Sequence, residues 1–128
     1  MVVKVLTFYR RNPNISKEEF SRLWREVGRI CQTSEDIQAL MYRYIQHELQ
    51  PAGNEYSESS ASEAGATTIG YDAMAEVWFY SQEAEAAVRE TKTFKEKLWP
   101  LEVQMIDWSE ATPTMIDTQF VQIVGPGG

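Results

Sequence analysis

The order of the expected strands and helices constrains the fold of this chain more than any other feature. Short runs rich in β-branched and aromatic residues, typical of strands, alternate with longer segments whose apolar residues recur at helical spacing. Strands are expected at 2–10, 41–49, 71–80 and 114–124, and one helix follows each of the first and third. This order predicts an α+β protein with a ferredoxin-like fold, in which two helices pack on one face of a four-stranded antiparallel sheet.

The first helix has a clear start signal. Ser16 and Glu19 have the spacing of a capping box, and the residues after them place apolar side chains on one stripe of a helix. Gly28 interrupts this stripe, so we expect the helix to end or bend near Arg29. The stripe consists of Phe20, Leu23, Trp24, Val27, Ile30 and Cys31.

The second helix is expected to begin after Ser81, a good N-cap residue, and to continue to about Leu98. Pro100 is expected to end this helix or to start a short helical piece at 101–107. Residues 1–124 form a single predicted domain, with a polar, mobile loop at 50–70 and a frayed tail at 125–128.

Composition excludes some classes of partner. A net charge of −7 disfavours nucleic acid and anionic membranes, which both require basic surfaces. The single cysteine, Cys31, cannot form an internal disulfide or a cysteine-rich zinc site, and it is expected to be buried. The sequence shows no signal peptide and no long apolar segment, so we expect a cytoplasmic protein.

The strands carry apolar side chains on both faces, and this predicts an assembly. Leu6 and Phe8 alternate with Val5 and Tyr9 along the first strand, so a monomer would expose a large apolar patch. We therefore expect two copies to pack sheet against sheet and form a homodimeric α+β barrel.

Four segments, in this order, resemble the EthD-like family of dimeric α+β barrel proteins, in particular the fungal members found with polyketide pathways. They read KVLTFYRRNPNISKEEFSRLWREV, YRYIQHEL, YDAMAEVWFYSQEAEAA and, last, MID. The resemblance implies a homodimer without metal or organic cofactor, and a pocket between sheet and helices for a hydrophobic, often polycyclic aromatic substrate. One departure stands out, because Gly28 lies where family members usually carry the histidine of a His-Gly-Pro or His-Ala-Pro signature.

Four residues are candidates for catalysis. His47, the single histidine, can take and give a proton near neutral pH, and the family pattern commonly has a histidine in this strand. If its strand face is buried, Glu76 is expected to have a raised pKa or to bond with Arg43. Asp72 is either a partner of substrate or histidine or a cap at the start of its strand. Tyr44 could hold a phenol or ketone oxygen.

Four further residues are candidates for substrate binding. Tyr9, Trp24 and Trp78 could line an aromatic pocket, and plain core packing is the preferred alternative for each of them. Arg29 could hold a carboxylate, and a solvated arginine is the alternative.

Two classes of function fit these residues. The first is a cofactor-independent lyase or cyclase that dehydrates, decarboxylates or closes a ring in a hydrophobic natural product, such as a polyketide intermediate. The sequence has no glycine-rich phosphate loop and no nucleophile elbow. A cofactor-free monooxygenase of aromatic intermediates is its rival within the enzyme class. The second is a non-catalytic binder of such small molecules, which the absence of a histidine at position 28 favours.

Overall fold

The computed structural model describes residues 2–49, 70–109 and 114–117 of the 128-residue chain. Most of the predicted loop, at 50–69, and the segment 118–128 lie outside the described residues. In chain order the elements are β1 (Val3–Tyr9), α1 (Lys17–Thr33), α2 (Glu35–Gln38), β2 (Met41–Glu48), β3 (Ala73–Phe79), α4 (Gln82–Val88), the π-helix η1 (Phe94–Leu98), α5 (Trp99–Met105) and β4 (Thr114–Asp117). The four strands are all antiparallel and pair in the order β2-β3-β1-β4, which is the strand order of a ferredoxin-like sheet.

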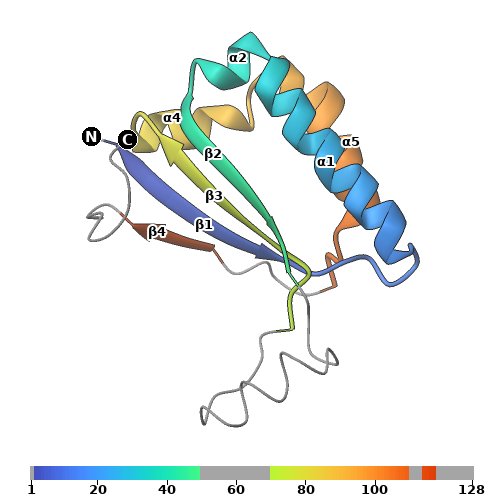
Figure 1. Ribbon diagram of the computed structural model, residues 1–128. Coiled ribbons are helices and arrows are strands. Elements are labelled where there is room, and N and C mark those ends of the chain that lie inside the picture. The colour runs from blue at the N-terminus through green and yellow to red at the C-terminus, as the bar shows by residue number, and fades with distance from the viewer. Residues whose placement is uncertain (1, 50–69, 110–113, 118–128) are drawn as a thin grey trace, which may run out of the picture.

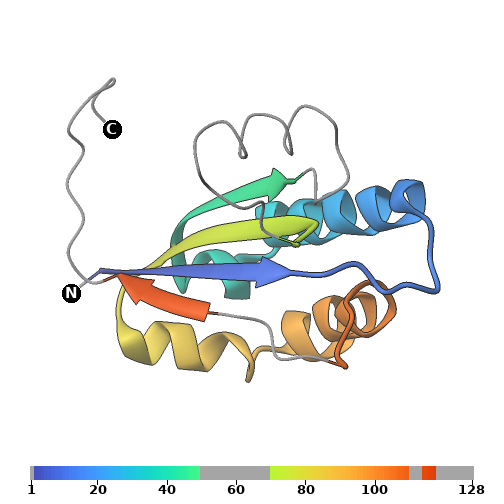
Figure 2. The ribbon, with the colours of Figure 1, turned by 90° about the horizontal axis from the view of Figure 1, so that it is seen from below.

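The helices lie on one side of the sheet, as Figure 1 shows. We call this side the covered face and the other side the open face. Figure 2 shows α1 on the side of β2 and the run from α4 to α5 on the side of β1 and β4. The core between the layers contains β-strand residues, such as Val5 and Ala75, and the inner stripes of the helices.

Helix α1 forms as its sequence predicts at the start and differs near its end. The Ser16 hydroxyl accepts a hydrogen bond from the backbone N–H of Glu19 at 3.0 Å, while the Glu19 carboxylate binds Arg22 instead of completing the capping box. The expected end near Arg29 is wrong, because the helix passes through Gly28 and continues to Thr33. All six residues of the predicted stripe are buried: Phe20, Leu23, Trp24, Val27, Ile30 and Cys31.

The predicted continuous second helix is wrong, because a break at 89–91 divides it into α4 and η1, and η1 then continues directly into α5. At the break, the Thr91 hydroxyl accepts from the N–H of Phe94 at 3.1 Å, and so starts a new helical segment. The Asp36 carboxylate, from α2, accepts from the N–H of Thr93 at 3.1 Å and from its hydroxyl at 2.6 Å. Pro100 lies in the first turn of α5, which follows η1 without a gap, so it stands at the start of the last helical piece, one of the two alternatives predicted.

The open face carries both apolar and charged side chains. Leu6, Phe8, Ile45 and Met74 are half-buried there, and strand register brings charged residues among them. Residues Lys4, Glu76 and His47 form an ionic cluster at its centre.

Candidate functional site

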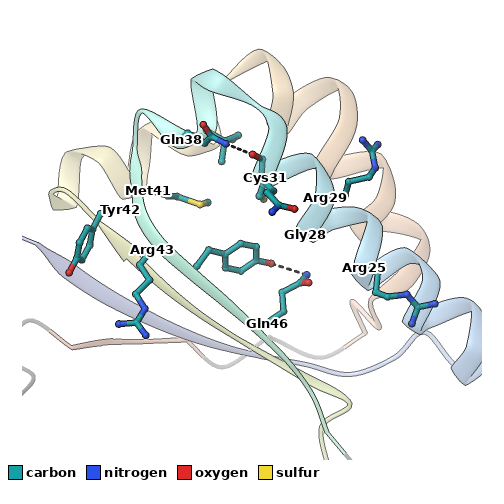
Figure 3. Close-up of a pocket in the computed structure, with 12 residues that line it drawn as sticks. Arg25, Gly28, Arg29, Cys31, Gln38, Met41, Tyr42, Arg43 and Gln46 are labelled. Carbon is teal, nitrogen blue, oxygen red and sulfur yellow. Dashed lines mark hydrogen bonds between the residues drawn. The ribbon is translucent and has the colours of Figure 1, made fainter. Parts of the chain in front are cut away.

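Two adjoining cavities lie between the sheet and the helices. The outer cavity, of about 500 Å³, lies between α1, α2 and β2 (Figure 3). The inner cavity, of about 140 Å³, lies deeper, between the covered face, α1 and the segment from α4 to α5. Both are lined by Cys31, Met41 and Tyr44, so these three residues form the boundary between them. The space as a whole has apolar walls and a few polar groups, as small-molecule sites generally do.

Glu102 is the main titratable group of the inner cavity. It lies on α5 in the same stripe as the buried Leu98 and Met105, four residues after the first and three before the second. Burial raises the pKa of its carboxyl group to about 7, although Arg89, which also lines the cavity, opposes the rise. A carboxyl with this pKa exchanges a proton readily at neutral pH, which is the property required of a general acid or base.

Tyrosine hydroxyls lie in the same space. Tyr9, from β1, lines the inner cavity, and Tyr44, from β2, lines both cavities. Burial raises the pKa of both phenols well above the ordinary value, so both stay protonated and can donate a hydrogen bond at any physiological pH. Burial likewise raises the pKa of the Cys31 thiol to about 12, which makes it a poor nucleophile.

Position 28, where the resemblance implied a histidine, borders the outer cavity as a glycine. An ideal Cβ atom there would lie 2.9 Å from Cδ of Gln46 and closer still to Oε1. Gln46 thus occupies the space next to α1 that a side chain at position 28 would need.

His47 and Glu76 lie together on the open face, on the other side of the sheet from Tyr44. His47 Nε2 and Glu76 Oε2 are 2.7 Å apart, and Lys4 Nζ lies 3.0 Å from the other carboxylate oxygen. Burial would raise the pKa of Glu76, but the hydrogen bonds from His47 and Lys4 outweigh it and leave the pKa below its ordinary value. The expected raised pKa is therefore wrong, and Arg43 does not bond with this carboxylate but lies over the Trp78 ring.

Asp72 lies just before β3 and has a structural contact. Its carboxylate accepts a hydrogen bond from the backbone N–H of Arg11 at 2.8 Å, and its own N–H donates to the Tyr9 carbonyl at 2.9 Å. These bonds join the end of β1 to the start of β3, as the cap interpretation predicts.

The predicted substrate-binding residues are distributed over both faces. Trp24 is buried in α1, where its ring lies 5.5 Å from that of Tyr9. Its indole Nε1 is buried and has no hydrogen-bond partner among the described residues. Trp78 is buried on the open face, with Lys4 over its ring. Arg29 lines the outer cavity, exposed and paired with Glu26.

Sequence reasoning missed Glu102, although the signal was present. The helical piece at 101–107 was predicted, and helical spacing places a residue at 102 on the same stripe as positions 98 and 105. A single carboxylate within an otherwise apolar stripe has a high desolvation cost, so it indicates either a buried partner or a functional group.

Two properties of the described residues bear on metals and membranes. Across residues 2–49, 70–109 and 114–117, no group of three or more His, Cys, Asp or Glu side chains could hold a metal ion. Among the helices of the same ranges, none is long and apolar enough to cross a membrane.

Comparison with known proteins agrees with the fold. A protein from Bacteroides fragilis described as dimeric, ferredoxin-like and of unknown function superposes with a TM-score of 0.63 at 6% identity, covering 91% of this chain and 94% of the other. The cofactor-independent oxygenase SnoaB from Streptomyces nogalater gives a TM-score of 0.57 at 7% identity over 95% and 96% of the chains.

A hydroxynitrile lyase from Passiflora edulis gives a TM-score of 0.58 at 13% identity over 98% of this chain and 97% of its own. These likenesses establish the ferredoxin-like α+β fold, while no curated protein sequence matches the chain. The sequence itself matches the EthD domain over residues 12–109, which is most of the 128 residues. The chain therefore belongs to the EthD domain family.

Proposed function

We propose that this protein is a cofactor-independent enzyme that transfers a proton on a hydrophobic substrate bound between the sheet and the helices. The reaction class that fits best is a lyase or cyclase step, such as dehydration or ring closure, on a natural-product intermediate of polyketide type. The observation that carries the proposal is the Glu102 carboxyl, whose pKa of about 7 results from its burial in the inner cavity.

The cavity groups supply the two functions that such a step needs. Ionised Glu102 removes a proton from a carbon next to a carbonyl group, and the electron pair of the C–H bond moves onto the carbonyl oxygen. The hydroxyls of Tyr9 and Tyr44 donate hydrogen bonds to this enolate oxygen. In a dehydration the enolate then expels a β-hydroxyl group, to which protonated Glu102 returns the proton, so that water leaves. In a ring closure the enolate carbon instead forms a bond to the carbon of a second carbonyl group, and protonated Glu102 gives its proton to the resulting alkoxide oxygen.

Related folds support an enzymatic function in general terms. SnoaB is described as a cofactor-independent oxygenase and the Passiflora edulis protein as a hydroxynitrile lyase. At identities of 7% and 13% they share the fold alone, so the proposed chemistry depends on the cavity of this chain.

A second candidate site lies on the open face. His47 and Glu76 are hydrogen-bonded at 2.7 Å, an arrangement in which a carboxylate orients a histidine base. In this alternative, Trp78 would hold the substrate and Asp72 would assist at the strand end. Tyr44, which lies on the covered face, would take no part.

Deuterium exchange tests the proposal without knowledge of the natural substrate. The probe is 2-tetralone, an aromatic ketone with acidic hydrogens next to its carbonyl group, incubated with the protein in D₂O and followed by proton NMR. We expect the protein to accelerate the loss of these hydrogens above the buffer rate. Binding of the ketone without any acceleration would favour the alternative of a small-molecule binder, and consumption of dioxygen would favour the monooxygenase.

We also propose that two copies associate through the open face, where Leu6, Phe8, Ile45 and Met74 lie half-buried. Neighbours of the same fold are described as dimeric, which supports this assembly. Sedimentation of the wild-type protein is expected to give twice the chain mass of 14.7 kDa.

Phe8→Glu is expected to give a folded monomer, because it places an unpaired charge in the interface. Gln104→Glu, which adds the same charge to the exposed surface of α5, is the matched control and is expected to remain dimeric. A dimer that persists in Phe8→Glu would contradict the open face as the interface.

A further inference from the structure

The Gln46 side chain bridges the two layers beside the proposed site. Its Nε2 atom lies 2.7 Å from the backbone carbonyl oxygen of Trp24 in α1 and 3.2 Å from the hydroxyl oxygen of Tyr44 on its own strand. Figure 3 shows the second of these bonds, at the boundary of the outer cavity. Gln46 therefore connects the helix backbone to a phenol that lines both cavities.

The chemistry of the partners fixes the direction of both bonds. A carbonyl oxygen only accepts, so the Gln46 atom facing Trp24 must be the amide nitrogen, which carries two hydrogens. One hydrogen goes to the carbonyl oxygen and the other goes to the Tyr44 hydroxyl oxygen. Because the Tyr44 oxygen accepts from Gln46, its own O–H is directed elsewhere.

Tyr9, which lines the inner cavity, also interacts with a side chain of its own strand. A hydrogen bond with the Thr7 side chain lowers the pKa of Tyr9, against the larger raising effect of burial. Each of the two phenols is therefore hydrogen-bonded to a polar side chain two residues away on its own strand.

Gly28 makes room for this arrangement. The Gln46 amide lies so close to α1 that a Cβ atom at position 28 would be 2.9 Å from its Cδ, tighter than ordinary contacts allow. Gly28 and Gln46 therefore form a matched pair across the layers, in which the missing side chain of one permits the position of the other.

We propose that Gln46 is a positioning residue, which holds the Tyr44 hydroxyl as a hydrogen-bond donor to an anionic oxygen of the ligand, and that Gly28 is required for this position. The inference rests on the proposed function for the identity of the ligand oxygen, an enolate or phenolate. It extends that function because Gln46, a residue of β2, determines how strongly the site binds such an oxygen.

The test uses Gln46→Leu, which keeps the size of the side chain and removes the donor. Gln32→Leu is the matched control, because Gln32 lines the same outer cavity from α1. Gly28→Ala is a second variant that displaces the amide without changing it. Two readouts are followed: the NMR signal of the Tyr44 ring carbon that bears the hydroxyl, and the binding of 4-nitrophenol at about pH 6, below the Glu102 pKa of about 7.

We expect the Tyr44 carbon signal to shift in Gln46→Leu and Gly28→Ala and to stay unchanged in Gln32→Leu. Bound 4-nitrophenol is expected to show the absorbance of its phenolate form in the wild type. The affinity of the phenolate is expected to fall about two- to tenfold in Gln46→Leu, the effect of one hydrogen bond.

An unchanged Tyr44 signal in Gln46→Leu would overturn the inference, as would equal phenolate binding by wild type and Gln46→Leu. The two proposals can fail separately. If the Tyr44 signal shifts in Gln46→Leu but the wild-type protein does not accelerate the exchange of 2-tetralone, the role of Gln46 is supported and only the proposed enzymatic function is contradicted.

Discussion

Replacing Glu102 by glutamine is expected to slow the exchange of 2-tetralone hydrogens about 100- to 10,000-fold, the usual contribution of a general base. The amide keeps the size of the carboxyl group and its place in the inner cavity, but it cannot accept a proton at neutral pH. The carboxylate is an effective base here because burial raises its pKa to about 7. NMR measurement of the exchange rate at a single pH, with saturating probe, checks this prediction.

Two variants serve as controls. Glu85→Gln makes the same chemical change at another residue that lines the inner cavity, where the carboxylate is paired with Arg89 at 3.1 Å. We expect it to change the rate by less than about tenfold, since a partly exposed ion pair contributes little. His47→Ala removes the base of the second candidate site. If His47→Ala abolishes exchange and Glu102→Gln does not, the reaction belongs to the open face.

The stability of the protein is expected to fall as pH rises through about 7, because of the same carboxyl group. Its pKa is about 7 in the folded protein and 4.5 as its reference value, so the folded state holds this proton more tightly than the unfolded state. The contribution of the protonated group is complete below pH 4.5 and is lost as pH rises through 7. A difference of this size corresponds to roughly 3 kcal/mol of unfolding free energy.

Urea unfolding across this range measures the effect, and Glu102→Gln isolates it. The variant has no proton to lose at this position, so its stability is expected to exceed that of the wild type on the alkaline side and to vary less with pH. Groups whose pKa the fold lowers, such as Glu76 and Asp36, lose their contribution only at more acidic pH. Parallel pH profiles for wild type and variant would show that burial does not perturb Glu102.

The sequence predicts the architecture well because strong local signals agree with one another. The capping residue Ser16 and the apolar stripe after it determine where α1 begins and which side faces the sheet. The end of α1 was not predictable from Gly28, since one glycine does not stop a helix whose apolar stripe packs into the core on both sides of it. The break between α4 and η1 depends on Asp36, which is 57 residues from Thr93 in sequence, so no local pattern reveals it.

The candidate site was harder to predict than the fold. A register shift between Met41 and Arg43 places Met41 on the same face as Tyr44, where strict alternation would separate them. Alternation does place His47 and Tyr44 on opposite faces of the sheet, and the structure agrees. The two side chains therefore cannot act on the same substrate in one site of a single chain. Helical spacing alone places Glu102 on an apolar stripe, and the structure adds that its side chain lines the inner cavity.

The pH dependence of 2-tetralone exchange tests most directly whether a buried carboxyl between the layers performs proton transfer. For the wild type, the account predicts a rate that rises with pH to a plateau with a midpoint near the Glu102 pKa of about 7. This midpoint is expected to disappear in Glu102→Gln and to persist in His47→Ala. A midpoint near 7 that remains in Glu102→Gln, or is lost in His47→Ala, would contradict the account.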